Sequence, residues 1–181
     1  AMLMYFCHKT MLAIAVTAAH PAFSSCYAFE KEIKSNFPFY RSKVFRLPVG
    51  SNMDEAHIKS EVGIKEFRQK ITKKGELLLG TFGSFHPSKN IPLIVRSLAE
   101  IQDETGQKIK YLFIGATRED ILERLDLELR AKASELIIGT GFLSNDQVGS
   151  YLKILDGYVG YFVDGVSTRR GSLIAALQNQ T

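Results

Sequence analysis

Segment 164–173 concentrates polar groups that could bind an anionic ligand: a carboxylate, hydroxyl groups, two guanidinium groups and two glycines. Ser167 or Thr168 can cap a helix that begins here, and the backbone amides that follow can hold an anion. Arg169 or Arg170 can pair with a phosphate or a carboxylate through two parallel hydrogen bonds. A capped helix with two solvated arginines is the alternative interpretation of the same residues.

A second loop, residues 80–90, also combines glycines with a cation. Glycines let the backbone approach a ligand closely, the next helix begins with unpaired N–H groups, and Lys89 offers a point charge for a phosphate. The spacing of the glycines matches neither a Walker loop nor the G-x-G-x-x-G fingerprint. A turn shaped by packing, with Lys89 merely solvated, therefore stays open as a second interpretation.

Both loops follow a short apolar run and precede an amphipathic stretch. This alternation predicts an α/β fold, a Rossmann-like parallel sheet with flanking helices. Such a sheet binds its ligands beside the carboxyl ends of its strands, which is where both loops would lie. The strands of this sheet are expected at residues 77–79, 111–114, 136–138 and 158–162.

The helices of the sheet are indicated by periodicity and by capping residues. Residues 91–104 carry apolar side chains at intervals of three and four, with Pro92 in the first turn, where its missing N–H costs nothing. Thr117 and Ser144 begin capping-box patterns, so a helix is expected after each. A last helix is expected to begin at Thr168. Residues 54–72 should form a surface helix that is broken near Gly63.

We expect two domains, residues 1–53 and residues 54–181, joined through the turn-rich residues 47–53. The first would contain one βαβ unit. Its strand, helix and second strand are expected at residues 11–17, 22–35 and 43–47. No further strand follows the last expected helix, so the second domain is expected to be incomplete.

The start of the chain has a second interpretation. Lys9 and the apolar run 11–19, with small residues near Cys26, are also typical of a secretory signal. The strand and the signal both stay open. No apolar run reaches the roughly 18 to 20 residues that a transmembrane helix needs. Cys7 and Cys26 form neither a disulfide framework nor a metal-binding pair, which fits a reducing compartment.

The composition is that of an ordinary globular protein. Of its 181 residues, 45% are hydrophobic and 23% are charged, which is enough for one sizeable core. The formal net charge of +4 suits anionic ligands but is too small for a nucleic-acid-binding protein. We therefore expect no nucleic-acid partner.

Taken in order, several segments resemble the retaining group 1 (family 4-like) glycosyltransferases of GT-B architecture. The resemblance depends on their order and spacing, since each motif is loose by itself. It implies the C-terminal, donor-binding half of a GT-B fold, preceded by the last βαβ unit of the N-terminal domain, in a sequence cut short at both ends. The similar segments are residues 46–52, 83–90, 111–115, 137–155 and 164–175.

The resemblance also implies a binding site for a nucleotide-diphosphate sugar. Lys89 would contact the diphosphate, the turn at 141–143 would lie near the base, and residues 164–168 would surround the sugar and the pyrophosphate. The implied donor-binding residues are Gly83, Ser84, Lys89, Gly141, Phe142, Leu143, Asp164, Gly165, Val166, Ser167, Thr168, Arg169, Arg170 and Ser172.

Three positions depart from the family's pattern. Ser84 stands where a basic residue is usual, and Asp164 and Ser172 stand where the family has two glutamates. Asp164 can still bind a sugar hydroxyl, whereas Ser172 has less reach toward a ribose. Arg169 or Arg170 can supply the missing charge.

The activity that the resemblance implies is sugar transfer, with retention, to an unidentified glycan, lipid or small-molecule acceptor. No cofactor and no metal are expected, because lysine, arginine and helix-terminal amides can neutralise the diphosphate. A cytoplasmic location is expected, with a membrane surface open as a partner. The alternative function is a non-catalytic nucleotide-binding or protein-interaction module derived from the same fold, which Ser84 and Ser172 favour.

Overall fold

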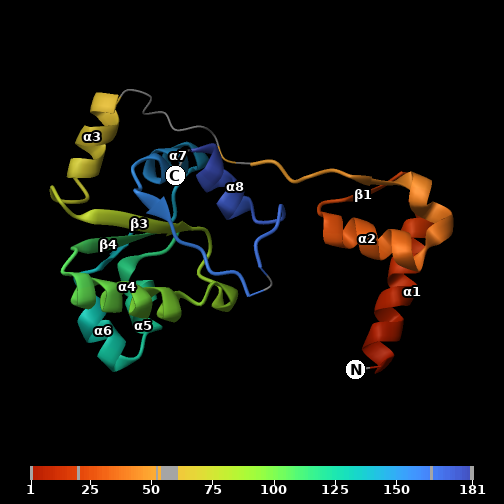
Figure 1. Ribbon diagram of the computed structural model, residues 1–181, viewed down its shortest axis with the longest axis horizontal. Coiled ribbons are helices and arrows are strands. Elements are labelled where there is room, and N and C mark those ends of the chain that lie inside the picture. The colour runs from red at the N-terminus through yellow and green to blue at the C-terminus, as the bar shows by residue number, and fades with distance from the viewer. Residues whose placement is uncertain (1, 20, 52, 54–60, 164, 180–181) are drawn as a thin grey trace. The chain divides into compact units, whose positions relative to one another are not determined.

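The structure is a computed structural model that describes residues 2–19, 21–51, 53, 61–163 and 165–179. The chain divides into two compact units, Ala1–Gly50 with Ser167–Arg169, and Ser51–Val166 with Arg170–Thr181. Figure 1 labels the α-helices and the strands β1, β3 and β4. In chain order they are α1 (Met2–Ala18), β1 (Ala22–Ser24), α2 (Tyr27–Asn36), the 3₁₀ helix η1 (Pro38–Lys43), β2 (Val44–Arg46), α3 (Glu61–Gln69), β3 (Leu77–Phe82), the 3₁₀ helix η2 (Pro87–Lys89), α4 (Ile91–Thr105), β4 (Ile109–Ile114), α5 (Arg118–Glu123), α6 (Leu127–Ala133), β5 (Ile137–Gly139), α7 (Asn145–Lys153), β6 (Gly157–Tyr158) and α8 (Gly171–Gln178).

The first unit contains a βαβ motif made of β1, α2 and β2. The two strands are parallel, with Ala22 opposite Val44, and the Leu47 N–H donates to the Ser24 carbonyl at 2.9 Å. Glu30 on α2 forms an ion pair with Lys34 at 2.7 Å. The motif was expected, but its first strand lies some ten residues later than the sequence predicted, and α2 is shorter than the expected helix 22–35.

The expected strand at residues 11–17 is wrong, because these residues belong to α1. The run is rich in alanine, leucine and methionine, which favour helices, and it continues an apolar stretch too long for one strand. The Thr17 hydroxyl donates to the Ala13 carbonyl at 2.8 Å, which satisfies a polar side chain within the helix. Among the described residues, no helix combines the length and the apolar character needed to cross a membrane.

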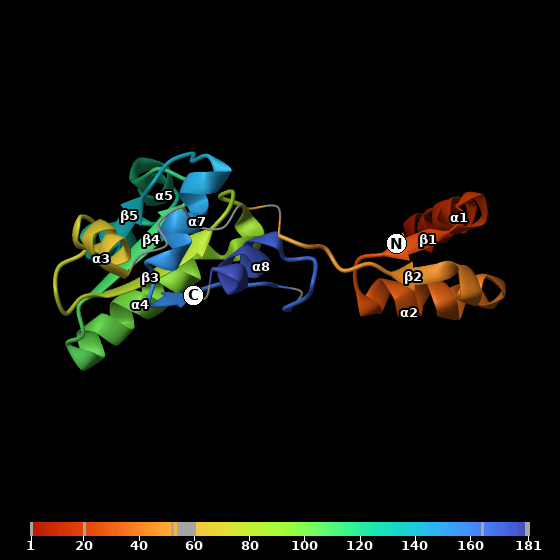
Figure 2. The ribbon, with the colours of Figure 1, turned by 90° about the horizontal axis from the view of Figure 1, so that it is seen from above.

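The second unit is built on a four-stranded parallel sheet with the strand order β5-β4-β3-β6. Figure 2 shows β5, β4 and β3 side by side. Leu79 of β3 lies opposite Tyr111 of β4, which in turn lies opposite Ile137 of β5. On the other side of β3, Gly80 lies opposite Tyr158 of β6.

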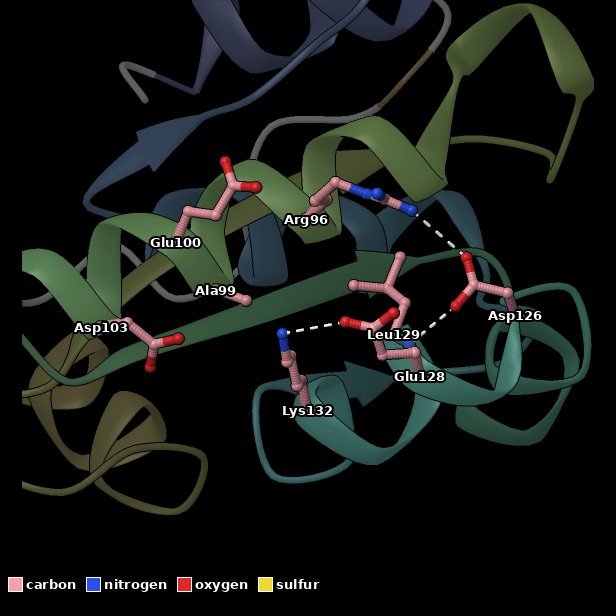
Figure 3. A pocket seen from close by; sticks show the side chains of 8 residues that line it. All are labelled: Arg96, Ala99, Glu100, Asp103, Asp126, Glu128, Leu129 and Lys132. Atoms are coloured by element: carbon pink, nitrogen blue, oxygen red, sulfur yellow. Dashed lines mark hydrogen bonds and ion pairs between the residues drawn. The ribbon is translucent and has the colours of Figure 1, made fainter.

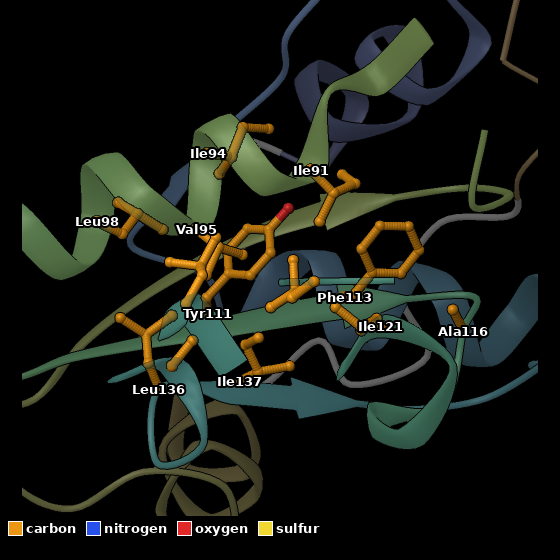
Figure 4. Packing of buried hydrophobic residues seen from close by; sticks show 13 residues of the cluster. Ile91, Ile94, Val95, Leu98, Tyr111, Phe113, Ala116, Ile121, Leu136 and Ile137 are labelled. Carbon is orange, nitrogen blue, oxygen red and sulfur yellow. The ribbon is translucent and has the colours of Figure 1, made fainter. Parts of the chain in front are cut away.

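Helices cover both faces of this sheet, because side chains on β4 alternate between two apolar clusters (Figure 1). Tyr111 and Phe113 pack with α4, α5 and α6, as Figure 4 shows. Leu112 and Ile114 pack on the opposite face with α7 and α8, and partly buried residues of α3 adjoin them. The result is a three-layer α/β/α unit, as the alternation of apolar runs predicted.

Several helices begin where the sequence predicted. Pro92 lies in the first turn of α4. Ile91, Ile94, Val95 and Leu98 of this helix are buried, whereas Ile101 is exposed. Thr117 caps α5, since its hydroxyl accepts a hydrogen bond from the Asp120 N–H at 3.1 Å. Before α7, the Ser144 N–H donates to the Gln147 side chain at 3.1 Å. Local capping chemistry thus sets these helix starts.

Three boundaries in the second unit differ from the prediction. β6 ends at Tyr158 instead of Phe162, because among the described residues the backbone pairing with β3 stops at Val159, whose N–H donates to the Gly80 carbonyl at 2.8 Å. α8 begins at Gly171 instead of Thr168. α3 is continuous through Gly63, so the expected break there is wrong. The expected residues 54–60 of this helix lie outside the described residues.

Candidate functional site

The strand order creates a switch point at the carboxyl ends of β3 and β6. The chain passes from β3 to β4 and β5 on one side, and then crosses to place β6 on the other side of β3. The loops after β3 and β6 therefore lead to helices on opposite faces of the sheet, α4 and α8, and open α/β sheets bind ligands beside such a point. Gly83 follows β3 directly, and Val159 follows β6.

The loop after β3 holds a lysine ammonium group close to its backbone. Lys89 Nζ donates to the Phe82 carbonyl at 2.6 Å and lies 5.8 Å from the centre of the Phe113 ring. Gly83 leaves room for it: its φ is +115°, and a Cβ at this position would lie 2.6 Å from Lys89 Nζ. Burial lowers the pKa of Lys89 to about 8. A partly desolvated ammonium group is thus held at the carboxyl end of the sheet.

The start of α8 lies against the same loop. A Cβ on Gly83 would lie 4.0 Å from the Ser172 Cβ, so the structure brings these two predicted residues and Lys89 together. Tyr158, at the end of β6, adjoins them: burial raises the pKa of its phenol, and the side chain of Ser172 partly opposes this. The amides in the first turn of α8 lack helical partners and can face an anion. The side chain of Ser84, in contrast, is exposed.

The turn after β5 has a fixed backbone and an exposed aromatic side chain. The Gly141 N–H donates to the Ala116 carbonyl at 2.9 Å, and the Thr140 N–H donates to the Phe113 carbonyl at 3.1 Å. Leu143 packs against the cluster under α7. Phe142 is 94% exposed, so its ring projects from a rigid turn at the carboxyl edge of the sheet. Such a ring can stack on a planar ligand group.

The loop after β6 contains the remaining predicted residues. Its Gly165 N–H donates to the Phe162 carbonyl at 2.9 Å, and the Arg170 guanidinium lies 4.9 Å from the centre of the Phe162 ring. The Val166 side chain is exposed. The Ser167 hydroxyl oxygen is buried without a hydrogen-bond partner among the described residues. Asp164, the predicted ligand of a sugar hydroxyl, lies outside the described residues.

Thr168 and Arg169 belong to the first unit. The Thr168 hydroxyl donates to the Ser25 carbonyl at 3.0 Å, and the Arg169 guanidinium lies 4.7 Å from the centre of the Phe29 ring. Neither Thr168 nor Ser167 caps α8, whose N-cap is Arg170. The capping role predicted for the two hydroxyls is therefore wrong, because two residues lie between Thr168 and the first helical residue, Gly171.

Sequence reasoning missed two buried residues that adjoin this edge, Thr81 and Tyr111. Their hydroxyl groups are hydrogen-bonded to each other at 2.7 Å. They are separated by 30 positions in the chain and belong to no local motif, so only the register of β3 and β4 reveals the pair.

The pocket in Figure 3 lies elsewhere, between α4 and α6. Its volume is about 90 Å³, and its charged side chains are largely paired with one another. Arg96 contacts Asp126 at 3.3 Å, and Lys132 contacts Glu128 at 3.1 Å. Exposed pairs of this kind are ordinary surface chemistry, and we assign no site to them.

The fold can be compared with known proteins. No protein-family model matches the chain, and no curated protein is significantly similar to it. Among solved structures it is similar to WaaG, a glycosyltransferase involved in lipopolysaccharide biosynthesis, with 13% identity and a TM-score of 0.67 over 88% of this chain and 42% of WaaG. It is also similar to Anabaena HepE in complex with UDP and glucose, with 14% identity and a TM-score of 0.64 over 94% of this chain and 46% of HepE.

A third similar structure is a glycosyltransferase from Rickettsia africae ESF-5, with 12% identity and a TM-score of 0.56 over 78% of this chain and 38% of that protein. The chain has the fold of part of a GT-B structure. The expected Rossmann-like α/β class is thereby confirmed. The chain spans less than half the length of each of these three GT-B proteins. The roles of the predicted donor-binding residues stay predictions.

Proposed function

We propose that the chain provides the donor-binding part of a glycosyltransferase that moves a sugar from a nucleoside diphosphate to an acceptor, with retention. The observation that supports this proposal best is the meeting of Gly83, Lys89 and Ser172 at the carboxyl ends of β3 and β6. A second support is the shared fold with HepE, which has been solved with UDP-glucose.

The proposed chemistry requires stabilisation of a leaving diphosphate. As the bond between the sugar carbon and the phosphate oxygen breaks, negative charge develops on that oxygen; the acceptor oxygen forms the new bond to the sugar carbon, and its proton passes to the leaving diphosphate. Lys89 can compensate this charge by turning from the Phe82 carbonyl toward the ligand, a small movement within the same loop. The first amides of α8 can add hydrogen bonds to the same phosphate. We propose that these groups act without a metal ion.

The other predicted residues complete the proposed site. Phe142 would stack on the base, since its exposed ring projects from a fixed turn. Asp164 would bind a sugar hydroxyl, and Arg170 would add positive charge near the pyrophosphate. We further propose that the acceptor is a glycan, lipid or small molecule and that the reaction takes place in the cytoplasm, at or near a membrane surface.

A thermal-shift titration with UDP, GDP and ADP, each free and linked to glucose, tests donor binding directly. A ligand that binds only the folded chain raises its melting temperature as its concentration exceeds Kd. We expect one nucleotide to be selected, and its shift to be reduced in Lys89→Met. The matched control is Lys108→Met, an exposed lysine beyond the amino end of β4, which should respond like the wild type. Chelation with EDTA should leave the shift unchanged.

The alternative function, a non-catalytic module, is favoured by Ser84 and Ser172. The first is exposed, and the second offers a short hydroxyl in place of a carboxylate. This alternative would be favoured if the chain bound a free nucleotide and its sugar-linked form with the same affinity. A folded chain that responds to none of the six ligands would contradict donor binding and would favour the protein-interaction form of the alternative.

A further inference from the structure

Thr81 and Tyr111 form a buried chain of hydrogen bonds that ends at the loop after β6. The Tyr111 hydroxyl donates to Thr81 Oγ1 at 2.7 Å, and the Thr81 hydroxyl donates to the Val159 carbonyl. Tyr111 is 0% exposed and Thr81 is 2% exposed. Tyr111 lies within the apolar cluster under α4, and Val159 packs against that cluster. Figure 4 shows the Tyr111 hydroxyl on the side of Ile91, in the first turn of α4.

The direction of this hydrogen-bond chain is fixed. Burial raises the pKa of Tyr111, so its hydroxyl keeps its proton and acts as a donor. Thr81 Oγ1 accepts this hydrogen bond, and the Thr81 hydroxyl must itself donate to another acceptor, because a buried hydroxyl without a partner is costly. The Val159 carbonyl is that acceptor. Phenylalanine and valine would fill the same space without any polar atoms, so packing alone does not require the two hydroxyl groups.

Val159 is the last residue held by the sheet before the loop begins. Its N–H donates to the Gly80 carbonyl at 2.8 Å, and its carbonyl accepts from Thr81, so both of its backbone groups are fixed. β6 has ended one residue earlier, and the next residues, Gly160 and Tyr161, are exposed. The direction in which the loop leaves the sheet is therefore set at Val159.

We propose that Thr81 and Tyr111 are positioning residues, which hold the Val159 carbonyl and thereby direct residues 160–163, the start of the loop after β6, toward the donor sugar and its diphosphate. As far as it concerns ligand binding, this inference rests on the proposed function. It assigns to two buried core residues, neither of which touches the ligand, the task of ordering a loop that does.

Hydrogen exchange tests the positioning role without any ligand. The variants are Tyr111→Phe and the double variant Tyr111→Phe/Thr81→Val, with Thr72→Val as the matched control. Thr72 is also a buried threonine, but its hydroxyl faces the Arg68 carbonyl at the end of α3. We expect the amides of residues 159–163 to exchange about tenfold faster in the double variant, in line with the loss of a buried hydrogen bond, and to be unchanged in the control. Equal exchange in all three variants would overturn the inference.

Ligand binding separates this inference from the proposed function. UDP-glucose and UMP are titrated against each variant, because UMP lacks both the second phosphate and the sugar that the loop would contact. We expect Tyr111→Phe/Thr81→Val to bind UDP-glucose about three to ten times more weakly, with UMP affinity unchanged. Equal losses for both ligands would indicate a general structural effect and contradict the positioning role. A wild-type chain that binds neither UDP-glucose nor the GDP and ADP sugars would contradict the proposed function, whereas the exchange result would still decide the positioning of the loop.

Discussion

The surroundings of Lys89 differ from those of an ordinary surface lysine. Its ammonium group contacts a carbonyl and the face of an aromatic ring, and its pKa is lowered to about 8 because burial disfavours the charged form. The sequence indicated a cation in this loop, since a lysine follows a glycine-rich turn after a strand. It could not reveal the burial, which depends on Phe113 from the next strand.

The lowered pKa predicts how stability depends on pH. Between pH 8 and about 10.4, the usual lysine pKa, the unfolded chain binds more protons at Lys89 than the folded chain, so the free energy of unfolding rises with pH. Below pH 8 the full cost of burying the charge is present. Lys89→Met should therefore increase the free energy of unfolding at pH 7 by at most about 3 kcal/mol. The variant should also lack the increase in stability between pH 8 and about 10.4. Urea titrations at pH 7 and pH 10 measure both effects, and an unchanged pH dependence would contradict the prediction.

Gly83 should tolerate no side chain. Its φ of +115° is unfavourable for other residues, and a Cβ would lie 2.6 Å from Lys89 Nζ. We expect Gly83→Ala to lower the free energy of unfolding by about 1 to 3 kcal/mol and to weaken nucleotide binding, because it displaces the ammonium group. Gly106→Ala is the matched control, since Gly106 also has a positive φ but has no atom within 4 Å of its Cβ position. Equal effects on binding in both variants would show that Lys89 is not involved.

At the scale of elements, the sequence predicted what local chemistry determines and missed what distant contacts determine. α4 was predicted from its apolar spacing, and the starts of α5 and α7 from their capping residues. The end of β6 was missed because the pairing with β3 covers only Gly157 and Tyr158, although the apolar run continues to Phe162. The helical state of α1 was missed because an apolar run without alternation fits a strand and a helix equally well. The loops of the candidate site were found by the same local rules, whereas the Thr81–Tyr111 pair was not.

An ion pair between residues far apart in the sequence connects α3 to the sheet. The Arg68 guanidinium donates to both carboxylate oxygens of Asp156 at 2.5 Å, and Asp156 also accepts from the Leu78 N–H at 2.7 Å. Burial raises the pKa of Asp156, but Arg68 and Leu78 outweigh it, so the pKa is lowered overall. Because both side chains are partly exposed, we assign the pair a modest contribution to stability.

Removing this contact should loosen α3. Arg68→Met should lower the free energy of unfolding at neutral pH by about 1 to 2 kcal/mol, and the difference from the wild type should shrink in acid, as the pH falls through the lowered pKa of Asp156 and its carboxylate becomes protonated. Arg96→Met, which removes the exposed pair with Asp126, is the control and should change stability by less than about 0.5 kcal/mol. Guanidinium titrations at pH 7 and pH 3 measure the effect, and equal losses in the two variants would contradict it.

At the scale of the molecule, the two units differ in how much they bury. In the first unit the described buried hydrophobic residues are Val16, Cys26 and Val44, whereas the second unit has two extended apolar clusters. Apolar burial is the main source of folding stability. The second unit should therefore determine the stability of the chain, although the division into an acceptor-side remnant and a donor-binding domain stays a prediction.

Deletion tests this division. Residues 51–181 alone should unfold cooperatively and keep the nucleotide selectivity of the whole chain, whereas residues 1–50 alone should lack a cooperative transition, because a segment this short buries too little apolar surface. Circular dichroism melting curves and the thermal-shift titration measure the two outcomes. Loss of nucleotide binding in a folded 51–181 chain would place part of the donor site in the first unit and contradict the predicted domain roles.

The exposed ring of Phe142 has a spectroscopic consequence. The sequence contains no tryptophan, so Phe142→Trp would give the chain a single indole fluorophore on the rigid turn after β5. Because the side chain is 94% exposed, its emission should resemble that of indole in water and be readily quenched by iodide. A nucleotide base stacked on it would shield it from iodide and change its intensity. The same turn that is proposed to recognise the donor thus offers an optical signal of its arrival.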